Sequence, residues 1–514
     1  KNNPSLYTEI GYNYTLQKDS LNAVKAYKKA IKFVNNNPNY AISVGNSFEK
    51  YNLLAEAEIT YLTALEADKT LNFDYQLANI YGQQNETQKM FDRYLKLIIN
   101  NKKNTAVIQN LVGRFITDNP ENKNNILLKK TILKNMQSTP DIFWNKQLSW
   151  LFVQQKEFSK AFTQEKAIFK RDGEDLTRIF NLGSLTKRKK DLKTSKKIFN
   201  FINDQPLSVE TKIEVAFLLL EIKEKNGLNL DYDLIINEYN KALDSFGINN
   251  NTIKIQLAYA NFLAFKKQDI TRAINFLKIN EKQSLSKFNK ARFQMTQADI
   301  LVADGKFNKA LLNYTKIQRN LKNNILSQEA RFKVAKTSYY KGDFNWALQQ
   351  LNVLKKSTSQ LIANDALDLH LLISDHINED SLNIALKKYA KADLLFFRKK
   401  NNEATLLLDD IINNHPVSKI IDDALYLQAS IYKIENEYKN AKNNYERIIN
   451  TLKESIFIDD ALFHLAIIEL INFNNPKKAM IHYESIIFNH ADSIYFVEAK
   501  KQYRKLRENL TNDS

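Results

Sequence analysis

A five-place pattern of small and large apolar residues recurs along the chain and restricts the fold more than any other feature of the sequence. Its first copy is Gly11, Tyr14, Ala23, Tyr27 and Ala30, and the same places recur 34 residues later. The second copy is Gly45, Phe48, Ala57, Tyr61 and Ala64. Seven further copies keep this internal spacing to within one residue: Ala78, Tyr81, Met90, Tyr94, Leu97; Gly183, Thr186, Ser195, Phe199, Ile202; Ala298, Leu301, Ala310, Tyr314, Ile317; Ala335, Ser338, Ala347, Leu351, Leu354; Ala392, Leu395, Ala404, Leu408, Ile411; Ala429, Tyr432, Ala441, Tyr445, Ile448; and Ala466, Glu469, Ala479, Tyr483, Ile486. A fixed period of this length indicates stacked repeats.

The spacing of the five-place pattern predicts a pair of antiparallel helices in each copy. Small residues at the first and third places let two helices approach closely, and large apolar residues one turn away fill the space between them. Turns are expected midway, at Gln17-Lys18-Asp19, Ala303-Asp304-Gly305 and Lys341-Gly342-Asp343. One hairpin cannot bury its own apolar face, so the copies are expected to stack into a solenoid.

The glycine and proline content supports a chain that is helical almost throughout. The sequence holds 10 glycines and 7 prolines in 514 residues, whereas average usage of about 12% would give roughly 60. Few residues are therefore available for the turns of an all-β or α/β fold.

At its period of 34, the five-place pattern resembles the tetratricopeptide (TPR) repeat. The resemblance covers nearly the whole chain and implies an all-α fold: a right-handed superhelical solenoid of about a dozen helical hairpins. A final helix, Tyr495 to Leu510, is expected to cap the stack with its charged face in solvent.

Breaks in the pattern suggest four segments, 1–103, 104–247, 248–377 and 378–514, of which 104–247 is the degenerate one. Asn104 to Pro140 fits the pattern poorly, and Trp144 to Ile168 fits it loosely. A lengthened loop is expected between Asn226 and Asp231, and the frame breaks between Asp375 and Lys391. These places are candidate hinges.

The last three copies have a period of 37 and helices that open with acidic pairs, as in Asp422-Asp423-Ala424-Leu425 and Asp459-Asp460-Ala461-Leu462. His415-Pro416-Val417-Ser418 precedes one of these helices. This segment resembles the TPR proteins of the bacterial envelope, such as the assembly lipoprotein BamD and the periplasmic partner of the Tol-Pal system. The resemblance implies a periplasmic or outer-membrane-associated location, with the cytoplasm as the alternative. The chain opens on Lys1-Asn2-Asn3-Pro4, so a preceding segment such as a signal peptide is one possibility and a fragment is the other.

No pattern of catalytic residues is present, and we expect no enzyme, no cofactor and no metal. The absence of cysteine excludes disulfides, thiolate zinc sites, iron–sulfur clusters and a cysteine nucleophile. The glycines form no phosphate-binding loop. The acidic pairs at helix starts are expected to cap their helices.

The chain carries a net charge of +18, and one basic cluster stands out around an expected turn. The cluster consists of Lys187, Arg188, Lys189, Lys190, Lys193, Lys196 and Lys197. It is either a solvated turn or a contact for an anionic lipid or an acidic protein. Aromatic residues, which would stack on bases, are not interleaved with it, so we do not expect nucleic acid as the main partner.

In TPR proteins the first helix of each repeat lines a groove that contacts ligands, and the resemblance assigns nine aromatic residues of this chain to that groove. They are Tyr12, Tyr75, Phe180, Phe332, Tyr339, Tyr389, Phe396, Tyr426 and Phe463. Asn46 and Asn79 occupy the place of the asparagine of a chaperone-binding clamp, but Ile42 and Tyr75 stand where the clamp has lysine. We therefore expect a non-enzymatic scaffold of the bacterial envelope that binds other proteins. The alternative is a cytoplasmic adaptor that contacts nucleic acid through its basic clusters.

Overall fold

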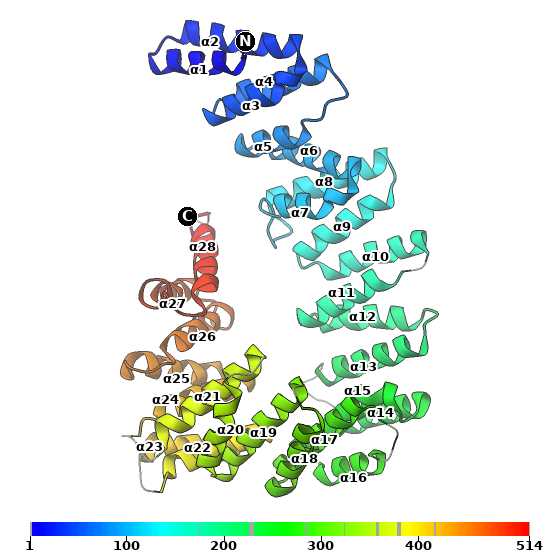
Figure 1. Cartoon of the computed structure of the whole chain (residues 1–514), viewed down its shortest axis with the longest axis vertical. Helices are drawn as coiled ribbons and strands as arrows, with labels where there is room; N and C mark the ends of the chain where they lie inside the picture. The colour runs from blue at the N-terminus through cyan, green and yellow to red at the C-terminus, as the bar shows by residue number, and fades with distance from the viewer. Residues whose placement is uncertain are drawn as a thin grey trace. The chain divides into compact units, whose positions relative to one another are not determined.

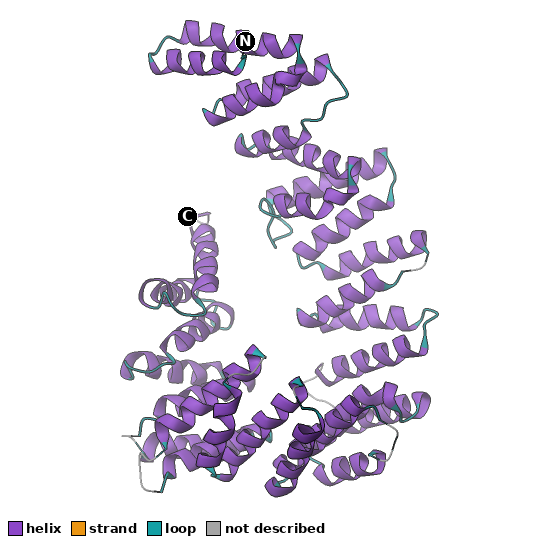
Figure 2. Cartoon of the chain, viewed as in Figure 1, coloured by secondary structure: helices purple, strands orange, loops and turns teal. Residues whose placement is uncertain are grey.

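The computed structural model describes residues 3–173, 175–225, 231–281, 283, 285–322, 324–355, 359–377, 382–415 and 418–512. Throughout these residues the chain consists of helices joined by short connections, without a β-strand (Figure 2). The contacts divide the chain into two units, Lys1–Leu228 and Asn229–Ser514. The prediction of an all-α solenoid is confirmed.

The first unit runs from blue to green in Figure 1. Its helices are α1 Ser5–Leu16, α2 Ser20–Asn36, α3 Ala41–Lys50, α4 Leu54–Ala67, α5 Asp74–Gln83, α6 Thr87–Asn100, α7 Thr105–Val112, α8 Lys123–Ser138, α9 Ile142–Gln154, α10 Phe158–Asp172, α11 Thr177–Arg188, α12 Leu192–Asn203 and α13 Val209–Lys225. Short 3₁₀ helices at Pro38–Tyr40 (η1) and Lys102–Asn104 (η2) precede α3 and α7.

The second unit runs from green to red in Figure 1. Its helices are α14 Tyr232–Phe246, α15 Ile253–Phe265, α16 Ile270–Asn280, α17 Lys287–Ala303, α18 Phe307–Asn320, α19 Ile325–Lys341, α20 Phe344–Leu354, α21 Gln360–His376, α22 Ile384–Phe397, α23 Asn401–Asn414, α24 Ile421–Ile434, α25 Tyr438–Thr451, α26 Ile458–Ile471, α27 Pro476–Asn489 and α28 Phe496–Asn512. A 3₁₀ helix, η3 Asn250–Thr252, precedes α15.

Eleven pairs of consecutive helices pack closely as hairpins among the described residues. They are α1–α2, α3–α4, α5–α6, α9–α10, α11–α12, α15–α16, α17–α18, α19–α20, α22–α23, α24–α25 and α26–α27. The helices outside these pairs include α7 and α8, which come from the segment where the pattern fits poorly, and α21, which ends where the predicted break begins. The lengthened loop expected after Asn226 lies outside the described residues, and the division between the units falls there.

The five-place pattern forms the core of both units. Of the residues in its nine copies, Tyr14, Leu97 and Tyr432 are half-buried and all the others are buried. The buried Glu469 occupies an apolar place in the last copy, and its carboxylate lies 2.5 Å from the ammonium of Lys442. An ion pair thus compensates the charge that this place buries.

The small residues at the first place are required by close contact between the two helices of a hairpin. A Cβ atom added to Gly11 would lie 2.3 Å from the ring of Tyr27, and one added to Gly45 would lie 2.3 Å from the ring of Tyr61. Such distances are shorter than any van der Waals contact. The tyrosine at the fourth place therefore fills the space that the glycine leaves.

Most hairpin turns among the described residues share one geometry, set by a residue in the left-handed conformation. Lys18, Asn52, Lys190, Gly305 and Gly342 hold this place, with φ between 57° and 88°. In each turn the next amide N–H bonds back to the second place of the pattern, as Asp19 N does to the Tyr14 carbonyl at 2.9 Å and Asp343 N to the Ser338 carbonyl at 2.8 Å. This bond is the one that ends a helix in a Schellman motif. The predicted turns at these places are confirmed.

The last helix, α28, ends the stack much as the sequence predicts. Ala499 and Leu506 are buried against the preceding hairpin, whereas Lys500, Lys501, Arg504, Lys505 and Arg507 are exposed. Among the described helices, none combines the length and the apolar character needed to cross a membrane.

Candidate functional site

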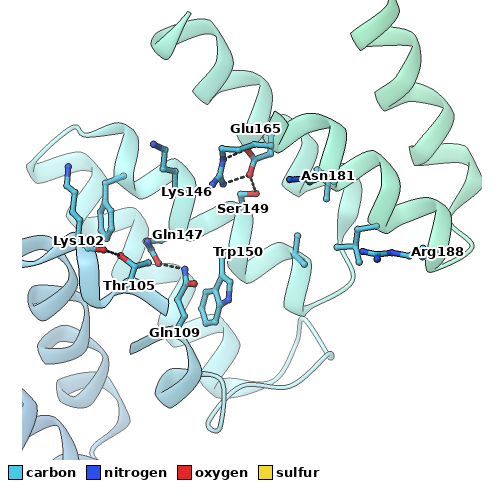
Figure 3. A pocket seen from close by; sticks show the side chains of 15 residues that line it. Lys102, Thr105, Gln109, Lys146, Gln147, Ser149, Trp150, Glu165, Asn181 and Arg188 are labelled. Atoms are coloured by element: carbon cyan, nitrogen blue, oxygen red, sulfur yellow. Dashed lines mark hydrogen bonds and ion pairs between the residues drawn. The ribbon is translucent and has the colours of Figure 1, made fainter. Parts of the chain in front are cut away.

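A hollow of about 650 Å³ in the first unit is lined mainly by α7, α9 and α11, and we call it the cationic hollow (Figure 3). The lining residues are Lys102, Thr105, Gln109, Phe143, Lys146, Gln147, Ser149, Trp150, Val153, Glu165, Arg178, Asn181, Leu182, Leu185 and Arg188. Because α9 and α11 are the first helices of successive hairpins, the hollow lies on the face that the resemblance assigns to ligand contacts.

One buried carboxylate holds an arginine at the wall of the cationic hollow. The side chain of Glu165 is 5% exposed, and it accepts two hydrogen bonds from Arg178, from Nε at 2.8 Å and from Nη2 at 2.7 Å. The Ser149 hydroxyl donates a further bond to the same carboxylate (Figure 3). Such a two-point contact fixes the plane of a guanidinium group. Arg178 is thus oriented, while 44% of its side chain stays exposed.

The remaining polar groups of the cationic hollow favour a negatively charged ligand. Lys102, Lys146, Arg178 and Arg188 line it, and Glu165, already bound by Arg178, is the one carboxylate among the lining residues, all of which the structure describes. Lys102 and Lys146 lie 3.7 and 3.5 Å from exposed aspartates, which are weak surface pairs. A ligand carboxylate could replace these pairs at little cost.

The lining also offers amide and aromatic groups. The Gln109 amide donates to the Gln147 side-chain oxygen at 3.0 Å, so the two side chains join α7 to α9. Asn181 is exposed on α11, and the half-buried Trp150 supplies apolar surface, whereas Phe143 is buried. The arrangement can bind an extended segment that carries both carboxylates and an apolar side chain.

The five-place pattern assigns no position to most of these residues, so the sequence did not identify them as candidates for ligand contacts. Segment 104–168 fits the pattern poorly or loosely, so no ligand-contacting place can be assigned in it. One signal was present: Gln147 and Asn181 stand 34 residues apart and occupy equivalent places on successive first helices. Arg188 is the one residue of the cationic hollow that the sequence analysis singled out.

The basic cluster around the α11–α12 turn is not one continuous patch. Lys187 is half-buried and forms an ion pair with Glu221 of α13, and Arg188 lines the cationic hollow. Lys189, Lys190, Lys193, Lys196 and Lys197 are exposed. Their side chains remain available to solvent or to a polyanion.

The nine predicted groove aromatics are placed differently from one another. Tyr75 is 46% exposed, and Tyr12, Phe180, Phe332, Phe396, Tyr426 and Phe463 are half-buried. Tyr339 and Tyr389 are 0% and 8% exposed, in one apolar cluster with Leu369 and Ile373 of α21. A partner cannot reach these two rings, and the prediction that they contact a ligand is corrected.

Three of the half-buried aromatics stack on a neighbouring repeat. The ring centroids of Tyr12 and Tyr51 lie 4.1 Å apart, those of Tyr426 and Phe457 4.6 Å, and those of Phe463 and Tyr495 4.2 Å. The hydroxyls of Tyr426 and Tyr495 both donate to Asp460. These rings therefore join successive repeats.

Asn46 and Asn79 have a structural role inside their hairpins. The Tyr61 hydroxyl donates to the Asn46 side chain at 3.2 Å, and the Tyr94 hydroxyl donates to the Asn79 side chain at 2.8 Å. Each asparagine thus anchors the tyrosine at the fourth place of its own copy. Among the described residues, no three histidine or carboxylate side chains are grouped so as to hold a metal ion.

Comparisons with known proteins found no matching family model and no matching curated protein. Among solved structures, the chain is similar to the P58(IPK) TPR domain at 14% identity, over 73% of this chain and 99% of that one, with a TM-score of 0.21. It is similar to a Rap protein complexed with competence and sporulation factor at 14% identity, over 64% and 92%, with a TM-score of 0.31. It is also similar to the APC/C component Cut9–Hcn1 at 12% identity, over 98% and 96%, with a TM-score of 0.25. At such scores, function has to be argued from this chain's own side chains.

Proposed function

We propose that this protein is a non-enzymatic scaffold that binds other proteins, and that the cationic hollow receives an acidic segment of one partner. The observation that carries this proposal is the set of four cationic side chains around a hollow whose one carboxylate is already bound. The half-buried Trp150 adds apolar surface for an aromatic or aliphatic side chain of the same segment. Aromatic and arginine anchors of this kind dominate the binding energy of many interfaces.

The test uses a fluorescent peptide that contains glutamates and one phenylalanine, titrated with the full chain. Substituting both Lys146→Ala and Arg188→Ala removes two cationic groups without touching the Glu165–Arg178 pair. We expect the Kd to rise roughly tenfold or more, which corresponds to about 1.4 kcal/mol.

The matched control, Lys190→Ala with Lys196→Ala, removes the same charge from the exposed turn and should change the Kd less than about twofold, because a screened surface charge contributes little. An equal loss in both variants would show that the peptide senses only net charge.

The same control tests the alternative of a nucleic-acid-binding adaptor, which the five exposed lysines of the turn support. Binding to phosphates alone weakens steeply as the salt concentration rises. Tight binding of duplex DNA at physiological salt, abolished in the control variant, would therefore favour that alternative.

We further propose that the scaffold works in the bacterial envelope. The support is the 37-residue period of the last three copies and the acidic pairs that open their helices. Cell fractionation of the source organism tests this location, and recovery in the cytosol alone would contradict it.

A further inference from the structure

Helix α21 lies outside the hairpin frame of the second unit. Hairpins α19–α20 and α22–α23 flank it in sequence, and α22 contacts α19 directly, as successive first helices do elsewhere. Between them α21 packs on α20 and α19 and buries Ala366, Leu369 and Ile373. Its last residue, His376, meets Asp423 at the start of α24, with Nε2 and Oδ2 3.0 Å apart. The inserted helix thus forms an additional wall beside the first helices.

Two adjoining hollows of about 880 and 450 Å³ lie between α21, the start of α24 and the segment 451–457. They share Asp375, His376, Asp423 and Ile456 in their linings, and we call the two adjoining hollows together the acidic cleft. Phe332 and Lys336 of α19 and Asp393 of α22 also line it. This cleft is separate from the cationic hollow, which belongs to the first unit.

The walls of the acidic cleft expose apolar side chains to solvent. Leu371 on α21 is 41% exposed, and Ile456 on the opposite segment is 72% exposed. Leu372, Phe457 and Phe332 continue the apolar lining. Apolar side chains on both walls of a cleft indicate a protein ligand.

The rim of the cleft is acidic in a chain that is strongly basic overall. Asp365, Asp368, Asp375, Asp393, Asp422, Asp423 and Glu454 line the two hollows, against Lys336, Lys419 and Lys453. Lys336 reaches Asp393 at 3.8 Å, and the Lys453 ammonium donates to the Ile449 carbonyl. The cations present are too few to pair with the carboxylates.

The electrostatics of the empty cleft point the same way. Burial raises the pKa of Asp393 and Asp423 above its usual value, and burial together with Asp365 raises the pKa of Asp368. A cation brought to this place would relieve the repulsion between these groups.

We propose that the acidic cleft binds a basic, amphipathic segment of a second partner protein. Aliphatic side chains of that segment pack on Leu371 and Ile456, and its lysine or arginine side chains pair with Asp365, Asp368 and Asp375. Charge complementarity over an apolar contact selects such a segment and rejects acidic ones. The scaffold then offers two sites of opposite charge.

The test uses a fluorescent peptide of leucine, lysine and alanine whose helix has one leucine face, titrated with the full chain. Asp365→Asn, Asp368→Asn and Asp375→Asn together remove three exposed carboxylates and are expected to raise the Kd roughly tenfold or more. Leu371→Ser with Ile456→Ser is expected to raise it several-fold. The circular dichroism spectrum of each variant checks that it is folded.

The control variant carries Glu66→Gln, Asp204→Asn and Asp244→Asn, which remove the same charge at exposed positions that do not line the cleft. It should leave the Kd within about twofold, because a screened surface charge outside the binding site contributes little. Equal weakening by the control would overturn the proposal, and so would equally tight binding of a peptide with alanine in place of leucine. Absence of saturable binding to the unaltered chain would also overturn it.

A last variant separates this proposal from the proposed function. Lys146→Ala with Arg188→Ala alters the cationic hollow only, and it should leave binding of the basic peptide unchanged. Loss of the basic peptide in this variant would contradict two separate sites, whatever the acidic peptide does.

Discussion

At the scale of single residues, the second unit places a half-buried histidine, His464, among tyrosines and next to a lysine. The His464 ring lies 5.8 Å from the ring of Tyr445 and 6.2 Å from that of Tyr495, measured between centroids. Burial, and then the Lys433 ammonium, lowers the pKa of His464 to about 4. The side chain is therefore neutral in the folded protein near pH 7, and protonating it costs stability.

The first prediction concerns this histidine. The unfolded chain has a histidine pKa of about 6.5, so the folded state binds fewer protons between that pH and about 4. The contribution to stability is complete above pH 6.5 and is lost as the pH falls towards 4. The shift corresponds to at most about 3 kcal/mol, and partial exposure reduces it.

Urea unfolding at neutral pH and near pH 4.5 measures this loss in the unaltered chain and in His464→Gln. The glutamine variant should lose less stability on acidification, by about 1 to 3 kcal/mol. Carboxyl groups with a raised pKa, such as Asp393 and Asp423, act in the opposite direction but are common to both proteins. Identical pH dependence of the two proteins would show that His464 does not titrate as a buried group.

At the scale of elements, the hairpin is the unit that repeats, and its turn requires one residue with positive φ. Glycine occupies that place in the α17–α18 and α19–α20 turns, whereas Lys18 and Asn52 hold it in the first two hairpins. A side chain in the left-handed region costs roughly 1–2 kcal/mol, and glycine avoids that cost at the expense of some chain entropy. The hairpins are therefore not equally stable.

The second prediction uses two opposite substitutions in these turns. Gly342 has φ of 88° and no atom within 4 Å of an added Cβ, so Gly342→Ala should destabilise the protein by about 1 kcal/mol through the backbone alone. Lys18→Gly, at φ of 61°, should stabilise it by a few tenths of a kcal/mol. Urea midpoints measure both effects. A neutral Gly342→Ala would mean that the turn has another conformation in solution.

Aromatic stacking also stabilises the packing of successive repeats on one another. Tyr426 and Phe463, which the resemblance assigns to ligand contacts, use one ring face each on Phe457 and Tyr495. Stacked pairs of this kind are worth about 0.5–1.5 kcal/mol beyond the area that they bury. Substituting them would change the stacking of the repeats as well as any contact with a ligand.

At the scale of the whole molecule, the chain divides into two compact units, Lys1–Leu228 and Asn229–Ser514. Solenoid repeats contact mainly their neighbours, so stability is close to a sum over adjoining repeats. The four segments suggested by breaks in the pattern remain a prediction.

The third prediction is that each unit folds without the other. The fragments Lys1–Leu228 and Asn229–Ser514 should each be helical and should each unfold cooperatively in urea. Their far-UV circular dichroism spectra, weighted by length, should add up to that of the full chain. A fragment that is unfolded by itself would show that the units depend on each other for stability.

Much of the fold could be predicted from the sequence because the five-place pattern is a local code. Gly45 and Tyr61 lie in one hairpin, and the ring of Tyr61 fills the space that Gly45 leaves. Because the two residues are close in the sequence, their spacing alone predicts this contact. The same holds for the turns at Lys18 and Gly342. The poor fit of the pattern between Asn104 and Pro140 also marked α7 and α8, whereas α21 lies before the predicted break at Asp375 and was not marked.

The two proposed sites depend on contacts that no local spacing encodes. The cationic hollow gathers residues between Lys102 and Arg188, and the acidic cleft gathers residues between Phe332 and Phe457. Each set comes together because neighbouring repeats stack with a particular rotation, and in the second unit because α21 packs on α19 and α20.

The helices, their pairing and their core were thus determined by the sequence alone, since each depends on residues within about one repeat of each other. Within the second unit, contacts between helices far apart in the sequence were decided by tertiary structure, as where the ring centroids of Phe265 and Phe397 lie 5.4 Å apart. The solvent exposure of the predicted groove residues was also decided by tertiary structure, because it depends on which helix from another part of the sequence packs over them.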